Sequence, residues 1–175
     1  MASKLHVDAI KHSGGTSALT IDSSGNLTAN ANLHYAGGVL QLVNGRVSDD
    51  RDATTSTSFV QLGDTLSITP KFSSSKILLI AVVSIEVSGG GHTAYMDFGR
   101  TTGGTTTKPL SGYSGGISTV YQESWNTKTY TFLDSPSTTS SVAYFCTFKV
   151  SAGTVSINDN SANNMTNFTL IEIAQ

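Results

Sequence analysis

The chain has 175 residues, which is enough for one ordinary domain with an additional arm and too few for two full domains. Only 13% of the residues are charged and the formal net charge is −2, so the chain lacks the basic surface that nucleic-acid binding requires. The 25 Ser, 24 Thr and 17 Gly, beside only 3 Pro, favour strands and turns over helices.

The first 37 residues alternate apolar and polar side chains but contain few large apolar ones. "KLHVDAI" and "SALTI" are typical of short strands, and "DSSGN" before "LTA" predicts a hairpin turn. We therefore expect residues 1–37 to form an extended, β-rich arm that buries its apolar side chains against a partner. The predicted docking residues are Leu5, Val7, Ile10, Leu19, Ile21, Leu27 and Leu33.

From residue 38 onward the predicted strands become longer and are separated by short turns, such as "GD" at residues 63–64. No stretch has a convincing helical period, so we predict an antiparallel, jelly-roll-like β-sandwich over residues 38–175. The expected strands lie in "VLQLVNGRV", "FVQLG", "TLSITP", "KILLIAVVSIEV", "TAYMDFGR", "GISTVYQESW", "KTYTFL", "SVAYFCTFKV", "GTVSIN" and "NFTLIEI".

The most apolar run, "ILLIAVVSI" at residues 77–85, is too short to cross a bilayer as a helix. We interpret it as the central strand of the core. "MASKLHVDAI" lacks the apolar stretch of a secretory signal, which favours synthesis in a cytoplasm without membrane insertion. The predicted core residues are Leu78, Ile80, Val82, Tyr95, Phe98, Tyr130, Phe132, Tyr144, Phe148, Phe168, Leu170 and Ile173.

Residues with catalytic or metal-binding chemistry are scattered along the chain. The four histidines form no pair at metal-ligand spacing on a predicted strand, and Cys146 falls in the apolar stretch "VAYFCTFKV", where a buried thiol is expected. We therefore predict no catalytic residue, no metal and no cofactor, and expect the protein not to be an enzyme. A hydrolase would draw its catalytic acids from Asp97, Glu123, Asp134 and Glu172.

Two aromatic residues on predicted loops are candidates for contact with a partner. Tyr113 stands among Gly and Ser in "PLSGYSGG", a composition that suits an adaptable binding surface. Trp125, the only tryptophan, lies in "YQESWN" near a strand end. Packing beneath a loop is the favoured interpretation for both side chains, and contact with a ligand is the alternative.

The stretch "TSTSFVQLGDTLSITPKFSSSKILLIAVVSIEV" resembles structural proteins of tailed bacteriophages, especially those of marine and cyanobacterial hosts. "TYTFLDSPSTTSSVAYFCTFKV", "GTVSIN" and "FTLIEIAQ" are similar to later strands of the same module. The opening "KLHVDAIKHSGGTSALTIDSSGNLT" is similar to segments that precede fibre and appendage modules in such phages. The resemblance implies a trimeric, jelly-roll-like protein of the virion surface with no enzymatic role.

Three functions follow from these patterns. In the first, the protein is a trimeric capsid decoration or cement protein, or a short head appendage, whose arm docks on the major capsid protein or another virion component. In the second, it is a tail fibre or tail-tip protein that contacts a host surface glycan or protein. The third is a depolymerase or other hydrolase.

Overall fold

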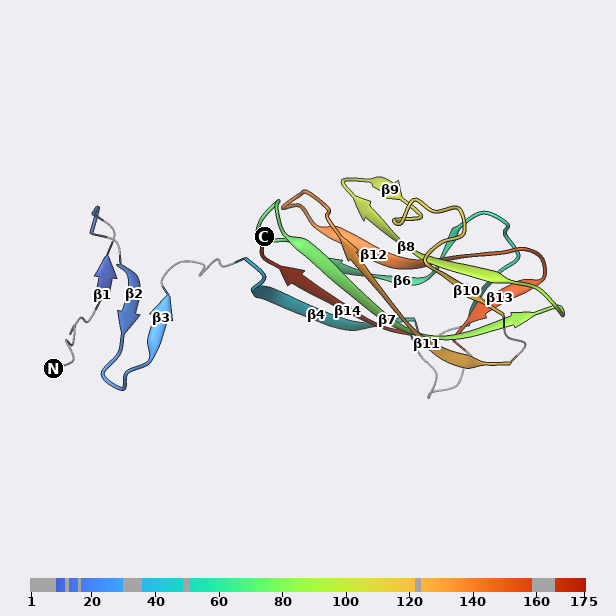
Figure 1. Cartoon of the computed structure of the whole chain (residues 1–175), viewed down its shortest axis with the longest axis horizontal. Helices are drawn as coiled ribbons and strands as arrows, with labels where there is room; N and C mark the ends of the chain where they lie inside the picture. Colours follow the sequence, from blue (N-terminus) through green and yellow to red (C-terminus); the bar gives the residue numbers. More distant parts are fainter. Residues whose placement is uncertain are drawn as a thin grey trace. The chain divides into compact units, whose positions relative to one another are not determined.

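A computed structural model of the chain describes residues 9–11, 13–15, 17–29, 36–48, 51–121, 124–158 and 166–175. The chain divides into two compact units, Met1–Tyr35 and Ala36–Gln175. All regular structure in the described part is β-strand, and each strand pair found there is antiparallel (Figure 1). The predicted all-β class is therefore confirmed.

The first unit contains a three-stranded sheet of β1 (Ala9–Lys11), β2 (Ser17–Ile21) and β3 (Leu27–Ala29) in that order. The carboxylate of Asp22 holds the turn between β2 and β3, because it accepts hydrogen bonds from the backbone N–H groups of Ser24 at 2.9 Å and Asn26 at 2.8 Å. The Asn26 side-chain amide donates a further bond, and these bonds lower the pKa of Asp22. The hairpin turn predicted at "DSSGN" is confirmed.

In the second unit eight strands pair in a nested manner, the first with the last. The pairs are β4 (Val39–Ser48) with β14 (Thr166–Ile173), β6 (Val60–Ile68) with β12 (Val142–Val150), β7 (Lys76–Ser88) with β11 (Asn126–Asp134), and β8 (Ala94–Thr102) with β10 (Ser118–Val120). Nested antiparallel pairing of this kind is the topology of a jelly roll. The predicted jelly-roll-like sandwich is thus confirmed.

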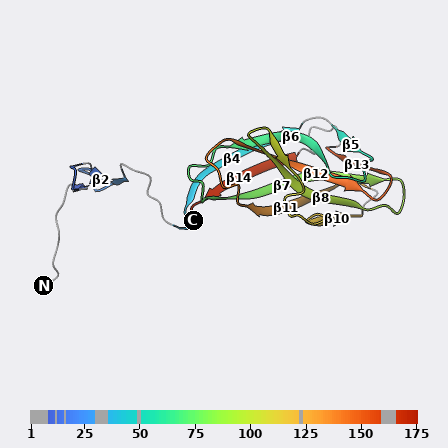
Figure 2. The same ribbon diagram turned by 90° about the horizontal axis from the view of Figure 1, so that it is seen from above.

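The paired strands form two sheets, which we call the β7 sheet and the β8 sheet. The β7 sheet has the order β4-β14-β7, with β11 on the other edge of β7, and the short strands β13 (Thr154–Ile157) and β5 (Asp52–Thr54) continue it. The β8 sheet has the order β10-β8-β12-β6, with β9 (Thr105–Thr107) also on β8. The strands of both sheets lie broadly along one common axis in Figures 1 and 2, with neighbouring strands antiparallel. The C-terminus lies beside the start of β4.

The core fills the space between the inner faces of these two sheets. On β7 the inward positions are Ile77, Leu79, Ala81 and Val83, which are fully buried. Phe98 of the β8 sheet meets two rings of the β7 sheet, those of Phe132 and Phe168, at centroid distances of 6.2 Å and 5.6 Å. The edge-to-face contact with Phe168 is the geometry that aromatic rings prefer, so this cluster ties the layers together.

The predicted core positions on β7 were wrong by one residue. Leu78, Ile80 and Val82 lie on the outer face of the sheet and are only half-buried, while their odd-numbered neighbours face inward. The run is apolar at every position from 77 to 83, so it carries no alternation from which the inward face could be assigned. Tyr95 and Ile173 also lie half-buried outside the core.

The turn predicted at residues 63–64 is instead a bulge within the continuous strand β6. Tyr144 pairs with Leu66 and Cys146 with Leu62, so β6 takes four steps where β12 takes two. Gly63 allows the kink because its φ is +76°, and its N–H donates to Asp52 at 2.6 Å. A glycine beside an aspartate therefore marked a bend in a strand and not its end.

We expect the sandwich to lose stability in alkaline solution. Burial raises the pKa of Cys146, Tyr130 and Tyr144 above their ordinary values of 9.0 for cysteine and 10.0 for tyrosine. Each group is neutral in the fold, so its stabilising contribution is complete below the ordinary pKa and is lost as the pH rises above it. The urea midpoint should fall from about pH 9 upward, and two tyrosines should ionise only on unfolding, as phenolate absorbance measures. Ionisation of all tyrosines in the folded protein would contradict this expectation.

Candidate functional site

The predicted docking residues of the N-terminal unit lie on its small sheet where they are described. Ile10 and Ile21 are exposed, and Ile10 pairs with the half-buried Leu19 across the β1–β2 ladder. Leu27 lies in β3 opposite Ile21. Leu5, Val7 and Leu33 fall outside the described residues. The docking role of this unit stays a prediction.

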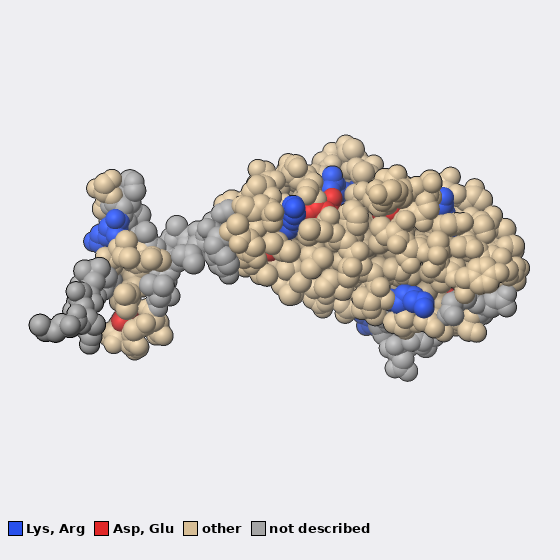
Figure 3. All heavy atoms as spheres, in the orientation of Figure 1, with Lys and Arg blue, Asp and Glu red and all other residues tan. Residues whose placement is uncertain are grey.

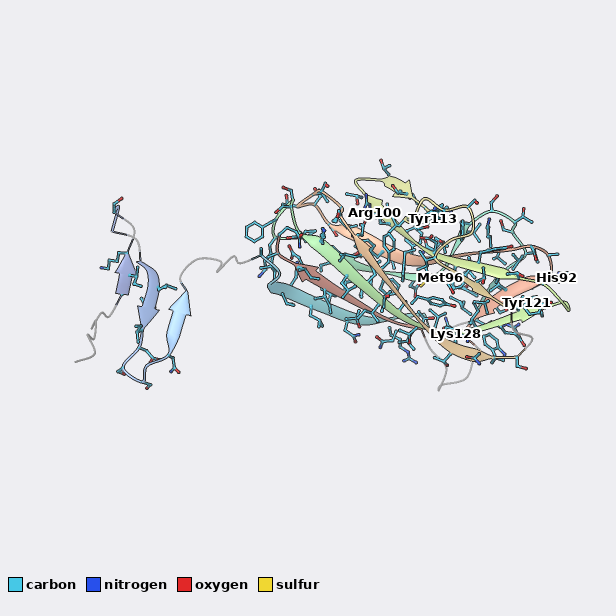
Figure 4. All side chains as sticks on the ribbon, in the orientation of Figure 1. His92, Met96, Arg100, Tyr113, Tyr121 and Lys128 are labelled. Carbon is cyan, nitrogen blue, oxygen red and sulfur yellow. The ribbon has the colours of Figure 1, made fainter. Side chains whose placement is uncertain are left out.

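The two predicted contact aromatics occupy different surroundings. Tyr113 is 71% exposed in the segment 108–117, which connects β9 to β10 (Figure 4). Trp125 is half-buried before β11, and the Arg51 guanidinium lies 5.3 Å from its ring centroid. Arg51 also pairs with Glu86 at 3.3 Å. Trp125 is therefore part of a packed cation–π contact, whereas the Tyr113 side chain faces solvent.

A shallow depression of about 420 Å³ opens where the segment 108–114 passes the segment 57–59. We call it the Lys149 pocket. Its lining residues are Thr57, Ser58, Phe59, Lys108, Pro109, Gly112, Ser114 and Lys149. It lies on the outer face of the β8 sheet, because Lys149 alternates along β12 with the buried core residues Phe148 and Val150. Sequence reasoning did not find this site.

Two aromatic rings position the ammonium group of Lys149. Its Nζ lies 5.0 Å from the ring centroid of Phe59 and 4.9 Å from that of Tyr95, its partner in the β8–β12 register. Among the described residues, no carboxylate lies within ion-pair distance of Lys149 or Lys108. The pocket therefore has positive charge that no carboxylate in the described part of the chain compensates.

Asp97 fastens the wall of the Lys149 pocket to β8. This side chain is fully buried, and its Oδ1 accepts hydrogen bonds from the N–H groups of Leu110 at 3.1 Å and Ser111 at 3.2 Å. The Ser111 hydroxyl donates to Oδ2. The N–H of Ile117 donates to the carbonyl of Met96 at 2.9 Å, so both ends of the segment are held on the same strand. The wall is preorganised before any ligand arrives.

The other candidate surface is the outer face of the β7 sheet. Leu42, Ile171, Leu78 and Leu133 stand opposite one another on β4, β14, β7 and β11, and we call these four residues the Leu42 row. Leu42 is 59% and Leu133 48% exposed, and the two central residues are half-buried. Ile80 borders the row on one side, and the register pair Val39 and Ile173 borders it on the other, where Lys76 of β7 stands opposite Ile173.

The Leu42 row is exposed apolar surface on a molecule with few charges. Beside it lies a row of Asn44, Thr169 and Thr131 around Ile80, all of them uncharged. Figure 3 shows the same scarcity on the visible face of the sandwich, where isolated blue and red atoms stand in a mainly tan surface. Apolar strips with polar margins are typical of interfaces between proteins.

Of the acids considered for hydrolysis, those that the structure describes accept hydrogen bonds from other groups of the fold. Asp134 accepts from Arg100 and from the hydroxyl of Tyr144. Glu172 is fully buried and accepts from the Gln41 amide at 2.6 Å and the Lys71 N–H at 2.7 Å. Glu123 lies outside the described residues. Within the described ranges, no three His, Cys, Asp or Glu side chains gather in a group that could hold a metal ion.

Comparisons with known proteins find similarity among solved structures. No protein-family model and no curated protein matches the chain. A solved chain from "Structure of infectious bursal disease virus Gt strain" is similar with a TM-score of 0.40 and 8% sequence identity. The alignment covers 97% of this chain and 43% of that one, so the chain spans less than half the length of this neighbour. No helix in the described part is long and apolar enough to span a membrane.

Proposed function

We propose that the chain is a non-enzymatic structural protein of a virus particle and acts as a homotrimer assembled through its β7 sheet. The observation that carries the proposal is the Leu42 row, an apolar strip left uncovered on the outer face of a jelly roll. Jelly rolls form many viral capsid and lectin domains, which supports the proposal by analogy of fold. The resemblance of the strand stretches to tailed-phage structural proteins supports it independently.

Two further copies of the chain, arranged with this one around a three-fold axis, suit this face in both area and charge. The eight residues of β14 and the four long strands of the sheet outline a flat area of about 500 Å². Standard interfaces bury about 800 Å² per partner, which is of the same order once side-chain relief is counted. The row and its flank of Asn and Thr carry no charge, whereas Lys76 and Arg46 stand farther out on the same face. The apolar strips of neighbouring copies therefore meet without repulsion where these two side chains stay at the margin.

The N-terminal unit supplies the attachment in this proposal. Ile10 and Ile21 are exposed on a three-stranded sheet, a size that provides little core of its own. Docking on the major capsid protein or another virion component would bury them. The protein would then serve as a capsid decoration or cement protein, or as a short head appendage.

The Lys149 pocket favours a second candidate, a tail fibre or tail-tip protein that contacts the host surface. A pocket with lysines, hydroxyls and rings is suited to a surface glycan, which a purely cementing protein does not need. Labelling the protein on intact particles separates the two roles. Label over the head supports the decoration protein, and label confined to the tail supports the fibre.

Assembly through the β7 sheet is tested by sedimentation of the full chain at micromolar concentration. We expect a trimer for the wild type and a monomer for the double variant Leu42→Ser and Leu133→Ser, whose side chains are exposed and so should not affect folding. Tyr113→Ser removes a similarly exposed aromatic outside the row and should stay trimeric. A folded wild-type monomer, or a double variant that remains trimeric, would overturn the proposal.

A further inference from the structure

We propose that the Lys149 pocket binds an anionic sugar, a saccharide unit that carries a carboxylate or a sulfate. This inference rests on the second candidate function above, contact with a surface glycan, and names the class of sugar; it does not depend on trimer formation. The pocket lies on the outer face of the β8 sheet, whereas the Leu42 row lies on the outer face of the β7 sheet. Assembly through one face therefore leaves the other accessible.

The charge of the pocket selects an anion. Lys108 and Lys149 are the charged residues in its described lining, and no described carboxylate neutralises either ammonium group. Because the rings of Phe59 and Tyr95 both hold the Lys149 ammonium in place, little of its conformational freedom remains to be lost when a ligand binds. An anion of one or two charges is matched by two lysines, while a nucleic acid would require a larger basic surface.

The remaining lining residues suit a sugar better than a bare inorganic anion. Thr57, Ser58 and Ser114 provide side-chain hydroxyls, and the rings of Phe59 and Pro109 provide an apolar wall. A sugar ring has hydroxyl groups at its edge and C–H groups on its face, so it uses both kinds of surface. The volume of about 420 Å³ falls in the range of about 300–1,000 Å³ for small-molecule sites.

Tyr113 extends this surface beyond the pocket. It lies between two lining residues, Gly112 and Ser114, and its ring is 71% exposed (Figure 4). An exposed tyrosine on an anchored segment offers a flat contact with a small loss of side-chain entropy. The next unit of a polysaccharide would pack on this ring.

The experiment is calorimetric titration of the full chain with short carboxylated oligosaccharides, with sulfated ones, with neutral ones of equal length, and with inorganic phosphate. We expect binding of one or both anionic sugars, with an affinity that falls as salt is added. Neutral sugars and phosphate should bind at least about tenfold more weakly, because each uses only part of the lining. The carboxylated and sulfated arms identify the anionic group.

Two lysine variants test the site itself. Lys149→Met keeps an apolar side chain of similar length beside the rings of Phe59 and Tyr95. Lys108→Gln changes an exposed side chain and should therefore leave the fold intact. Each should weaken binding of the anionic sugar about tenfold. Lys128→Gln is the matched control, since Lys128 lies on β11 outside the pocket, and it should bind as the wild type does (Figure 4).

Several results would overturn the inference. They are no binding of any anionic sugar, equal binding of neutral sugars, phosphate binding as strong as sugar binding, and equal losses in Lys108→Gln and Lys128→Gln. The titration is repeated on the double variant Leu42→Ser and Leu133→Ser. If that variant still binds the anionic sugar, the pocket functions whatever the oligomeric state of the variant. A failure of the trimer proposal is thereby distinguished from a failure of the pocket proposal.

Discussion

Replacing Gly99 with alanine should lower the free energy of unfolding by about 2–3 kcal/mol, because the new methyl group overpacks a filled site. A Cβ at Gly99 would lie 2.3 Å from Cε2 of Phe145, its register partner on β12. The Phe145 side chain is 1% exposed and has little room to move away. The Phe145 ring packs over the glycine and fills the space that a side chain at position 99 would otherwise occupy. Urea unfolding measures the loss.

A second glycine provides the control for this substitution. Gly115 has no neighbouring atom within 4 Å of a built Cβ, and Gly115→Ala should change stability by less than about 0.5 kcal/mol. Phe145→Leu should make room, so the pair Gly99→Ala and Phe145→Leu should be less destabilised than the two single effects added together. Additive losses, or a Gly99→Ala variant as stable as the wild type, would show that the ring does not constrain this site.

Replacing Asp134 with alanine should destabilise the sandwich by about 3 kcal/mol, because it leaves the buried Tyr144 hydroxyl and the partly buried Arg100 guanidinium without their acceptor. Asp134 ends β11 in the β7 sheet, whereas Arg100 and Tyr144 belong to β8 and β12 of the β8 sheet. Its carboxylate pairs with Arg100 and accepts the Tyr144 hydroxyl at 2.7 Å, so one acid links the two layers. Thermal or urea unfolding gives the difference.

Two further variants separate charge from hydrogen bonding in this cluster. Tyr144→Phe removes a single hydrogen bond to a charged acceptor and should cost about 1.5–2 kcal/mol. The double variant Asp134→Leu and Arg100→Leu removes both charges, and it should be more stable than Asp134→Ala because no unpaired guanidinium remains. A loss below about 1 kcal/mol for Asp134→Ala would mean that solvent, which reaches part of Arg100, replaces the carboxylate.

The two proposed surfaces suit a protein that is held on a particle and still reaches a ligand. The Leu42 row belongs to the β7 sheet and the Lys149 pocket to the β8 sheet, so the sandwich separates the surface for assembly from the surface for binding. Neither surface was predicted as such. Tyr113 was singled out from sequence, and it lies in the segment that forms one wall of the pocket.

Sequence patterns predicted the candidate surfaces only in part, because the residues that form each surface are far apart along the chain. The Gly- and Ser-rich composition of "PLSGYSGG" identified a loop with an exposed aromatic, which is a local property. Phe59, Lys108 and Lys149 come from separate segments and share a pocket only because the β8 sheet brings them together. The outward position of Lys149 on a strand was visible in the alternation of "TFKV", but its aromatic neighbours were not.

By itself the sequence determined the all-β class and most strands of the sandwich, because alternation and turn composition act over a few residues. Only the tertiary structure decided which face of residues 77–83 is buried, since a run that is apolar on both sides has no preferred face until sheets pack on it. It also decided that Gly63 bends a strand, and which distant side chains meet. These outcomes depend on the nested strand pairing, and no local pattern encodes that pairing.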